Sequence, residues 1–399
     1  MNIFKKLYCR TFQFVFKLAI PLLPYRQPKI LQTPNDTANT LDALNAKHAF
    51  IVTDAGVMGL GLCDGIISEL NALGIAHTVY DKTMPNPTID AVEDAREQYI
   101  SNGCDAIIAV GGGSPMDLAK AVGARIAKPK KSLKKMAGIL RVGKKLPPLF
   151  AVPTTAGTGS ETTLAAVITD GQTHRKFAIN DFPLIPKYAV LDYKLTLGLP
   201  RTITAQTGMD ALTHAVEAFI GRSTTKDTRA KAIEAVKLVH DNLKICYDDP
   251  QNGTARNNML HAAHYAGIAF TKSYVGYAHA VAHSLSGKYG LAHGLTCAVM
   301  LPKTLEFYGK AAHKKLARLA CEIGLADKSD KPAEAAKRFI QWVYDMNEYL
   351  GIPKGFAEIQ EADIPQMAKF ADKEGNPLYP VPKLANAKQL QKLYYSVKL

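Results

Sequence analysis

Hydrophobic and polar positions between residues 48 and 155 alternate between short β-rich runs and longer amphipathic stretches. The β-rich runs predict four strands, over 48–54, 75–81, 104–114 and 148–155. The stretches between them predict three helices, over 58–73, 88–102 and 115–127. Strands that alternate with helices are typical of a parallel sheet covered by helices on both faces. This part of the chain is therefore predicted to be an α/β domain with a parallel sheet.

Beyond Leu199 and Pro200 the pattern changes to long helical stretches with almost no β-rich runs. A chain of 399 residues is long enough for two domains of roughly 100–200 residues each. We predict an amphipathic basic segment at 1–30, an α/β domain at 31–198 that starts with a polar linker to about residue 47, and an all-helical domain at 199–399.

The first 20 residues have the pattern of an amphipathic helix. Four polar residues would form one stripe on its surface: Lys6, Arg10, Gln13 and Lys17. The rest would be largely apolar, as at Phe4, Leu7, Phe14 and Leu18. Lys17 interrupts the apolar stretch, so the segment fits neither a signal peptide nor a membrane-spanning helix. We expect a helix that lies in a membrane interface. The alternative is an apolar arm that docks on the body or on another subunit.

The formal charge of +14 is concentrated in two segments. Residues 1–35 carry six basic residues and residues 125–145 carry nine, and neither segment has an acidic residue. The remaining chain has 34 basic and 35 acidic residues, which argues against a generally basic nucleic-acid-binding protein. The basic run 125–145 also has no aromatic residues on which bases could stack. We therefore expect no nucleic acid as a partner.

The six cysteines lie at least 24 residues apart and form no C-x-x-C motif. Such spacing favours a reducing compartment over a disulfide framework. We expect a cytoplasmic protein, with peripheral contact of residues 1–20 with the inner face of the membrane.

Two loops rich in small residues follow predicted strands of the α/β domain. Residues 111–117 read Gly-Gly-Gly-Ser-Pro-Met-Asp, and residues 153–161 read Pro-Thr-Thr-Ala-Gly-Thr-Gly-Ser-Glu. Glycines between a strand and a helix N-terminus can hold a phosphate, because backbone amides and the helix dipole both favour negative charge. Asp54 ends the first strand, where a carboxylate can accept from ribose hydroxyls and repel a 2′-phosphate. Together these features favour NAD over NADP.

Histidines gather in the second half of the chain, where seven of the eleven lie between residues 214 and 293. Asp210 and His214 are four positions apart, so they share one helical face. His279 and His283 repeat that spacing, and His293 follows. One carboxylate and three imidazoles suit a divalent metal such as Fe²⁺ or Zn²⁺ with open positions for substrate. By spacing alone, a further pair competes as ligands: His261 and His264.

At this level of detail the sequence resembles the iron-containing (group III) alcohol dehydrogenases, from about residue 47 to the C-terminus. The matching motifs are GGGSPMDLAKAVG (111–123), PTTAGTGSE (153–161), VITD…HRKF (167–177), TGMDALTHAVEAF (207–219) and HAVAHSLSGKYGLAHG (279–294). The resemblance implies an α/β dinucleotide-binding domain followed by a helical metal-binding domain, the fold shared with dehydroquinate synthase. It leaves residues 1–46 and the basic run 125–145 without a counterpart.

Carried over onto matching positions, the resemblance also implies roles for individual residues. The metal ligands would be Asp210, His214, His279 and His293, and His283 would be an additional histidine near the substrate. The resemblance does not assign His261 and His264 as ligands. The residues implied in dinucleotide binding are Asp54, Asn86, Gly112, Gly113, Ser114, Asp117, Thr154, Thr155, Val167 and Lys176.

These assignments predict an alcohol dehydrogenase or aldehyde reductase. A divalent metal polarises the substrate oxygen, and hydride passes between the carbinol carbon and the nicotinamide. His283 is the candidate for proton transfer to solvent, because imidazole titrates near neutrality; its alternative role is to support a metal ligand. We expect a homodimer or higher homo-oligomer. If residues 1–20 lie on a membrane, medium- or long-chain alcohols and aldehydes become candidate substrates.

Other activities remain open. Within the family, the alternatives are lactaldehyde or polyol dehydrogenase, maleylacetate reductase and hydroxyacid-oxoacid transhydrogenase. From another class, the alternative is a membrane-surface or nucleic-acid-binding protein that keeps a vestigial enzyme fold. The complete set of predicted metal ligands favours the enzyme.

Overall fold

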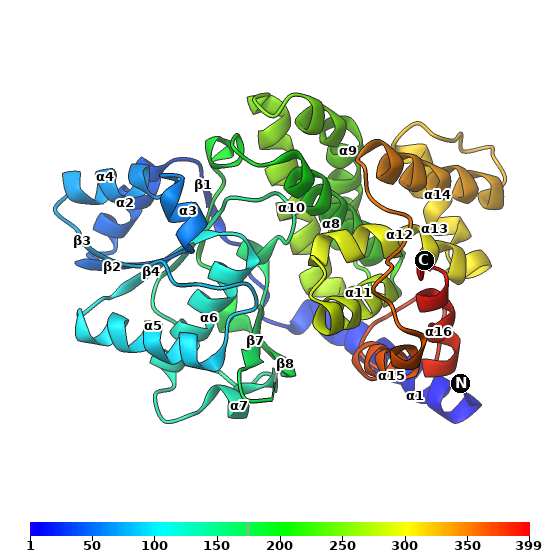
Figure 1. The fold of residues 1–399 in the computed structure, drawn as a ribbon, viewed down its shortest axis with the longest axis horizontal. Helices are drawn as coiled ribbons and strands as arrows, with labels where there is room; N and C mark the ends of the chain where they lie inside the picture. The colour runs from blue at the N-terminus through cyan, green and yellow to red at the C-terminus, as the bar shows by residue number, and fades with distance from the viewer. Residues whose placement is uncertain (174) are drawn as a thin grey trace. The chain divides into compact units, whose positions relative to one another are not determined.

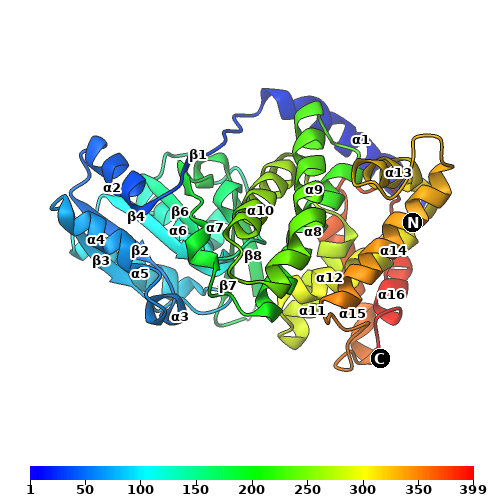
Figure 2. The same ribbon diagram turned by 90° about the horizontal axis from the view of Figure 1, so that it is seen from above.

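The structure is a computed structural model that describes residues 1–173 and 175–399 (Figures 1 and 2). The chain divides into two compact units, of which one comprises residues 24–198. The other comprises residues 199–399 together with residues 1–23, so the N-terminal segment packs with the helical half of the chain. Of the expected 174–177 motif, His174 lies outside the described residues.

A six-stranded parallel sheet forms the centre of the α/β unit, in the order β1-β9-β6-β4-β2-β3. Its strands are β1 (Lys29–Leu31), β2 (His48–Val52), β3 (Ala76–Tyr80), β4 (Ala106–Gly111), β6 (Leu149–Pro153) and β9 (Tyr188–Val190). The helices of this unit are α2 (Pro34–Ala43), α3 (Ala55–Gly59), α4 (Asp64–Ala72), α5 (Ile89–Ser101), α6 (Gly113–Ala127) and α7 (Leu133–Met136). The predicted α/β fold with a parallel sheet is confirmed.

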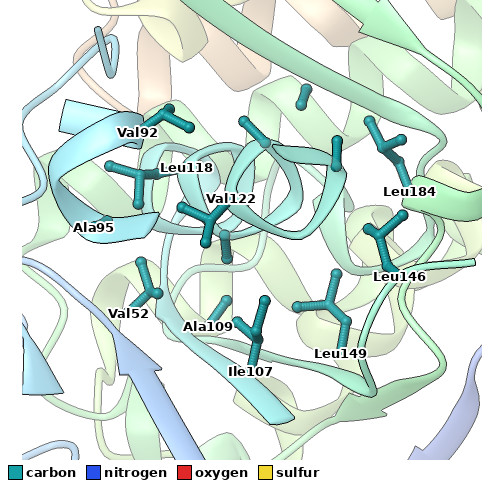
Figure 3. Close-up of a cluster of buried hydrophobic side chains, with 14 of the residues drawn as sticks. Val52, Val92, Ala95, Ile107, Ala109, Leu118, Val122, Leu146, Leu149 and Leu184 are labelled. Atoms are coloured by element: carbon teal, nitrogen blue, oxygen red, sulfur yellow. The ribbon is translucent and has the colours of Figure 1, made fainter. Parts of the chain in front are cut away.

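Apolar side chains cover both faces of this sheet, as a parallel sheet requires. On one face, Val52, Ile107 and Leu149 pack against Val92 of α5 and Val122 of α6 (Figure 3). On the other face, alternate strand residues pack with α2 and α4. The strand β4 is buried along its whole length, because it lies in the middle of the sheet with helices on both sides.

The strand order reverses between β2 and β4. The chain runs from β2 outward to β3, returns to β4 on the other side of β2, and continues to β6. In parallel α/β sheets, ligands bind beyond the carboxyl ends of the strands at such a reversal. The carboxyl ends of β2 and β4 lead to Asp54 and to the glycines that start at Gly111, so both predicted cofactor segments lie at this position of the sheet.

Two local predictions differ from the structure. The predicted helix 58–73 is two helices, α3 and α4, separated by a turn in which Gly61 has a positive φ of 70°. The polar linker expected to about residue 47 contains α2, whose capping box joins Thr33 and Asp36. A polar sequence therefore forms a helix here because its N-terminus is capped and Ala38 and Leu41 are buried.

A smaller sheet in the same unit has the order β5-β8-β7. It consists of β5 (Gly138–Ile139), β7 (Ala165–Asp170) and β8 (Arg175–Asn180), with β7 and β8 antiparallel. It carries two predicted cofactor residues, Val167 and Lys176.

The second unit is helical apart from short turns. Its helices are α1 (Ile3–Ala19), α8 (Arg201–Ile220), α9 (Lys226–Asp248), α10 (Gly253–Ser273), α11 (Tyr277–Tyr289), α12 (His293–Tyr308), α13 (His313–Glu322), α14 (Pro332–Tyr349), α15 (Ile364–Gly375) and α16 (Ala387–Tyr395). The central helix α8 is buried on nearly all sides from Gly208 onward. Within the described residues, no helix combines the length and apolar character needed to cross a bilayer.

Candidate metal centre and cofactor loops

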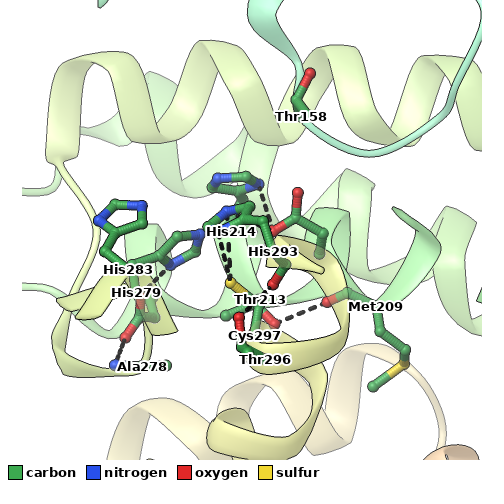
Figure 4. Close-up of polar contacts among 12 residues, drawn as sticks. Thr158, Met209, Thr213, His214, Ala278, His279, His283, His293, Thr296 and Cys297 are labelled. Carbon is green, nitrogen blue, oxygen red and sulfur yellow. Dashed lines mark hydrogen bonds and ion pairs between the residues drawn. The ribbon is translucent and has the colours of Figure 1, made fainter. Parts of the chain in front are cut away.

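The four predicted metal ligands converge inside the helical unit, from three different helices. Figure 4 shows three of them, His214, His279 and His293, close together. Asp210 of α8 lies at the centre of this group. Its Oδ1 atom is 3.8 Å from Nδ1 of His214, 3.7 Å from Nε2 of His279 on α11 and 3.5 Å from Nε2 of His293 on α12. The i, i+4 spacing places Asp210 and His214 on one face of α8, and the packing of α11 and α12 brings the other two imidazoles to that face.

The donor atoms fit a divalent cation. Asp210 Oδ1, His214 Nδ1 and His279 Nε2 are buried, and none of the three has a hydrogen-bond partner among the described residues. A buried polar atom without a partner costs about 1–3 kcal/mol, so three such atoms facing one point require an explanation. Imidazole nitrogens with a carboxylate oxygen suit Fe²⁺ or Zn²⁺, which would satisfy all three atoms at once.

The protonation states of Asp210 and His214 also suit a cation. Burial lowers the pKa of His214 to about 3, against the opposing effect of Asp210, so its imidazole is neutral and has a free lone pair. Burial alone would raise the pKa of Asp210, but the neighbouring histidines outweigh it and hold that pKa below its usual range. Asp210 and His214 therefore offer an ionised carboxylate and a neutral imidazole, the forms in which these side chains bind metals. At His279, burial would lower the pKa, but Cys297, Asp210 and Glu217 outweigh it and raise the pKa, so a bound metal would have to displace a proton from this imidazole.

Glu217, which the sequence analysis did not single out, holds His279 in place. Its Oε2 atom accepts hydrogen bonds from His279 Nδ1 at 2.6 Å and from the backbone amide of Gly276 at 2.8 Å. Its Oε1 atom accepts from the amide of Ala278 at 2.8 Å. With Nδ1 donating to a carboxylate, Nε2 of His279 is the nitrogen left for a metal. The available signal was its spacing, because Glu217 lies seven residues after Asp210 and therefore on the same face of α8.

Cys297 is a second neighbour that the sequence analysis did not include. It is buried on α12, one turn after His293, and its Sγ atom is 3.6 Å from His293 Nε2. The potential ligand atoms of Asp210, His279, His293 and Cys297 all lie within 4.8 Å of one another. His214 is not part of that tighter group, although its ring lies 4.3 Å from the His279 ring. The i, i+4 spacing from His293 was the signal for Cys297.

The competing pair His261 and His264 lies on α10, where both rings pack near Tyr265. Neither belongs to the group of potential ligands found among the described residues. Spacing alone could not separate this pair from the ligands, because it does not tell which face of α10 meets α8.

His283 lies one turn after His279 on α11, at the edge of the group. Its ring stacks on that of His293 with centroids 5.1 Å apart, and its side chain is 42% exposed. Its Nδ1 atom is 2.6 Å from Oε1 of Glu374 on α15. Burial would raise the pKa of Glu374, but His283 outweighs it and holds that pKa below its usual range. His283 is therefore oriented by an ionised carboxylate and still reaches solvent.

In the α/β unit, the predicted phosphate loop has the geometry of an anion site. Gly111 has a φ of 146°, and a Cβ atom there would lie 2.7 Å from the Pro115 ring, so only glycine fits. The next residue, Gly112, is the N-cap of the 15-residue helix α6 and carries no side chain over its first amides. Ser114 follows in the first turn. Backbone amides at a helix N-terminus attract phosphate.

The second loop is held beside the first. The amide of Thr154 donates to the Gly111 carbonyl at 3.1 Å, and Thr155 Oγ1 lies 3.5 Å from where a Cβ of Gly112 would be. The buried ammonium of Lys120, which the sequence analysis did not include, donates to the backbone carbonyl and hydroxyl of Ser160 at 2.7 and 2.9 Å. A lone lysine within the apolar run of α6 was the signal for this contact.

The remaining predicted cofactor residues lie in the same unit. Asp54 caps α3, its carboxylate accepting from the Val57 amide at 2.9 Å, and Asp117 accepts from the Val167 amide at 3.2 Å. Burial raises the pKa of Asp117 to about 6. Asn86 is exposed after β3, with a φ of 60°. Lys176 lies opposite Thr169 in the β7–β8 pair.

Comparisons with known proteins agree with this arrangement. Residues 28–193 match the family described as "Iron-containing alcohol dehydrogenase", and residues 204–397 match "Fe-containing alcohol dehydrogenase family, C-terminal". The 1,3-propanediol dehydrogenase of Citrobacter freundii is 36% identical over 384 residues, which is 95% of this chain and 98% of that protein. The NAD-dependent methanol dehydrogenase of Bacillus methanolicus is 35% identical over 338 residues, which is 84% of this chain and 88% of that protein.

A solved structure shares the fold as well. The alcohol dehydrogenase from Oenococcus oeni matches with a TM-score of 0.89 and 32% sequence identity, covering 94% of this chain and 100% of that one. One family match lies in each of the two units of the molecule, and residues 1–27 lie outside both matches. The chain therefore belongs to the iron-containing alcohol dehydrogenase family and is an oxidoreductase that acts on alcohols.

Proposed function

We propose that this enzyme transfers hydride between an alcohol and NAD, with Fe²⁺ held by Asp210, His214, His279 and His293. The observation that carries the metal site is the convergence of three buried ligand atoms that have no hydrogen-bond partner. Zn²⁺ suits the same ligands, and metal analysis of the purified protein distinguishes the two ions. A vestigial fold without activity is not favoured, because such a fold would have no reason to keep these atoms unpaired.

The proposed dinucleotide site uses both loops and Asp54. The amides of Gly112, Gly113 and Ser114 would hold the pyrophosphate at the N-terminus of α6, and Thr154 and Thr155 would contact the dinucleotide from the second loop. The Asp54 carboxylate supports NAD over NADP because it repels a 2′-phosphate. The proposed surrounding contacts are Asn86, Asp117, Val167 and Lys176.

The chemistry is divided between the bound groups and the protein. A divalent metal supplies Lewis acidity toward the substrate oxygen, and NAD supplies the hydride acceptor. Glu217 fixes the orientation of His279, and the Glu374 carboxylate fixes that of His283. His283 takes the proton released by the alcohol, because it adjoins His293 and reaches solvent.

Replacing His283 with alanine is expected to lower kcat for alcohol oxidation by about 10²-fold or more. Oxidation releases a proton that needs an acceptor, and this requirement gives the wild-type rate an acidic limb in its pH profile. That acidic limb should flatten in H283A, while the metal content should stay that of wild type. E374Q, which keeps His283 but removes its charged partner, should shift the limb rather than remove it. An unchanged pH–rate profile would contradict proton transfer, and loss of metal in H283A would indicate support of a ligand instead.

The proposed substrate range follows from the relatives and from the N-terminal helix. The two relatives are named for 1,3-propanediol and methanol, which supports small primary alcohols. Medium- and long-chain alcohols or aldehydes are a second proposal, which depends on membrane contact. Initial rates with a series of primary alcohols from methanol to dodecanol, each with NAD⁺ and NADP⁺, test both. We expect turnover with NAD⁺ to exceed that with NADP⁺ by about tenfold or more; turnover of none of these alcohols would overturn the proposed reaction.

Location and assembly complete the proposal. All six cysteines are free in the described structure, which supports a reducing, cytoplasmic environment. We also propose a homodimer or higher homo-oligomer, and peripheral contact with the inner face of the membrane through residues 1–20.

A further inference from the structure

The N-terminal helix α1 is attached to the helical unit by its polar side. Gln13 is buried, and its Nε2 atom donates to the carbonyls of Pro377 and Tyr379 at 3.0 and 2.8 Å. Arg10 donates to the carbonyls of Val381 and Pro382 at 2.8 and 2.9 Å. Two members of the predicted polar stripe are thus anchors on the protein. The predicted alternative of an arm docked on the body holds in part, although Phe4, Leu7, Phe14 and Leu18 remain exposed.

Further contacts fix α1 along its length. Cys9 and Ile20 are buried, and the ring of Phe16 packs on Tyr274 with centroids 5.2 Å apart. Lys5 forms an ion pair with Asp372 of α15 at 3.0 Å. Figure 2 shows α1 lying along the side of the helical unit. The helix is therefore held in one orientation, and which residues face outward is determined by the fold.

The outward side of α1 is apolar. Helix geometry places its residues on the face opposite Cys9 and Gln13. The exposed fractions are Ile3 71%, Phe4 79%, Leu7 64%, Tyr8 60%, Phe14 61%, Val15 58% and Leu18 61%, and Leu22 after the helix is 86% exposed. A surface helix normally turns such residues toward the core, so a largely apolar face in the opposite direction, which also contains exposed Thr11, marks an interaction site.

The charges beside this outer face select the partner. Lys6 and Lys17 are exposed on one flank, and residues 1–35 contain no acidic residue. A second copy of the chain, meeting the same face about a two-fold axis, would present the same α1 residues, none of them acidic, so its α1 would offer these lysines no opposite charge. Anionic lipid headgroups offer the opposite charge, and the acyl boundary offers an apolar medium. Aromatic and aliphatic residues with flanking lysines are typical of helices that lie in the interface.

We propose that the outer face of α1 docks in the plane of an anionic membrane surface. Phe4, Leu7 and Leu18 enter the acyl boundary, and Lys6 and Lys17 contact headgroup phosphates. The proposal deepens the peripheral contact proposed above by assigning the lipid-facing residues. The polar anchors Arg10 and Gln13 hold the enzyme to the helix, so the whole protein is retained at the surface.

The test is flotation of the full-length protein with vesicles of neutral phosphatidylcholine, with or without 30% phosphatidylglycerol. We expect binding to the anionic vesicles, weakened by 0.5 M salt, and at least about tenfold weaker binding to the neutral ones. Leu7→Ser/Leu18→Ser should reduce the partition coefficient by about tenfold or more. Its matched control is Ile100→Ser, an exposed apolar residue on α5 that should bind like wild type.

A charge variant separates the two parts of the proposal. Lys6→Glu/Lys17→Glu should lose the preference for anionic vesicles, whereas Lys314→Glu/Lys328→Glu, with equal charge change on exposed lysines elsewhere, should not. Equal binding to both vesicle types, or wild-type binding by Leu7→Ser/Leu18→Ser, would overturn the proposal. The proposal would also be overturned if the wild-type protein bound no vesicles and Leu7→Ser/Leu18→Ser had a smaller mass by sedimentation than the wild type. That result would assign the outer face of α1 to contact with a second copy. All variants should oxidise a short alcohol in solution at the wild-type rate, so this test stands apart from the proposed reaction.

Discussion

Replacement of His279 by alanine is expected to abolish both metal binding and turnover. His279 supplies a buried nitrogen without a hydrogen-bond partner, 3.7 Å from Asp210 Oδ1, and alanine has no ligand atom to replace it. Removing one of four ligands leaves a site that cannot retain a tightly bound divalent ion, so we expect kcat to fall by about 10³-fold or more. The measurements are the metal-to-protein ratio by elemental analysis and the initial rate with NAD⁺ and alcohol.

The matched control is His240→Ala. His240 lies on α9 and pairs with Asp241 at 2.7 Å, outside the group of potential ligands. It should keep the wild-type metal content and rate. A H279A protein that is folded, free of metal and fully active would refute the proposed metal centre.

Replacement of Glu217 by alanine is expected to weaken metal binding by about 10–100-fold, although Glu217 itself contacts no metal. The change removes three hydrogen bonds and leaves His279 free to rotate or to place its proton on Nε2. It also leaves the buried amides of Gly276 and Ala278 without hydrogen-bond acceptors, so the free energy of unfolding should fall by about 3 kcal/mol. The measurements are the metal Kd by competition with a chelator and urea unfolding of the metal-free protein.

Replacement of Glu217 by glutamine distinguishes the role of this side chain in orienting His279 from its role in filling space. It keeps the volume but has only one acceptor oxygen, whereas the native carboxylate uses one oxygen for Ala278 and the other for Gly276 and His279. We expect E217Q to keep most of the stability and to recover only part of the metal affinity. Glu322→Gln, on the surface beside Lys237, is the control and should change neither quantity. Wild-type metal affinity in both position-217 variants would remove Glu217 from the site.

The predicted elements agree with the structure where the hydrophobic periodicity is clear within the segment itself. The strands β2, β3, β4 and β6 and the helices α5 and α6 lie within two residues of the predicted ranges, apart from the glycines that extend the third predicted strand. The short strands β1 and β9 were missed because three residues carry too little pattern and depend on pairing with a neighbour. The break between α3 and α4 was missed because the apolar pattern continues through a turn made by Gly61.

For the candidate site, the sequence by itself determined which side chains share a helical face. The spacing of Asp210 with His214, and of His279 with His283, follows from helix geometry, which is local. The glycine loop after β4 is equally local, because a backbone conformation that only glycine adopts is needed there. These features identify the chemistry of the site before any tertiary contact is known.

Only the tertiary structure decided which faces meet. It separated His261 and His264 from the proposed ligands, added Glu217 and Cys297 to the neighbourhood of the proposed metal centre, and turned Arg10 and Gln13 of α1 inward. Each of these results depends on packing between helices far apart in the sequence, and the period of a helix contains no information about its neighbours. The amphipathic pattern of α1 was visible in the sequence, but its direction was set by the carbonyl groups of residues 377–382, to which the helix is bound.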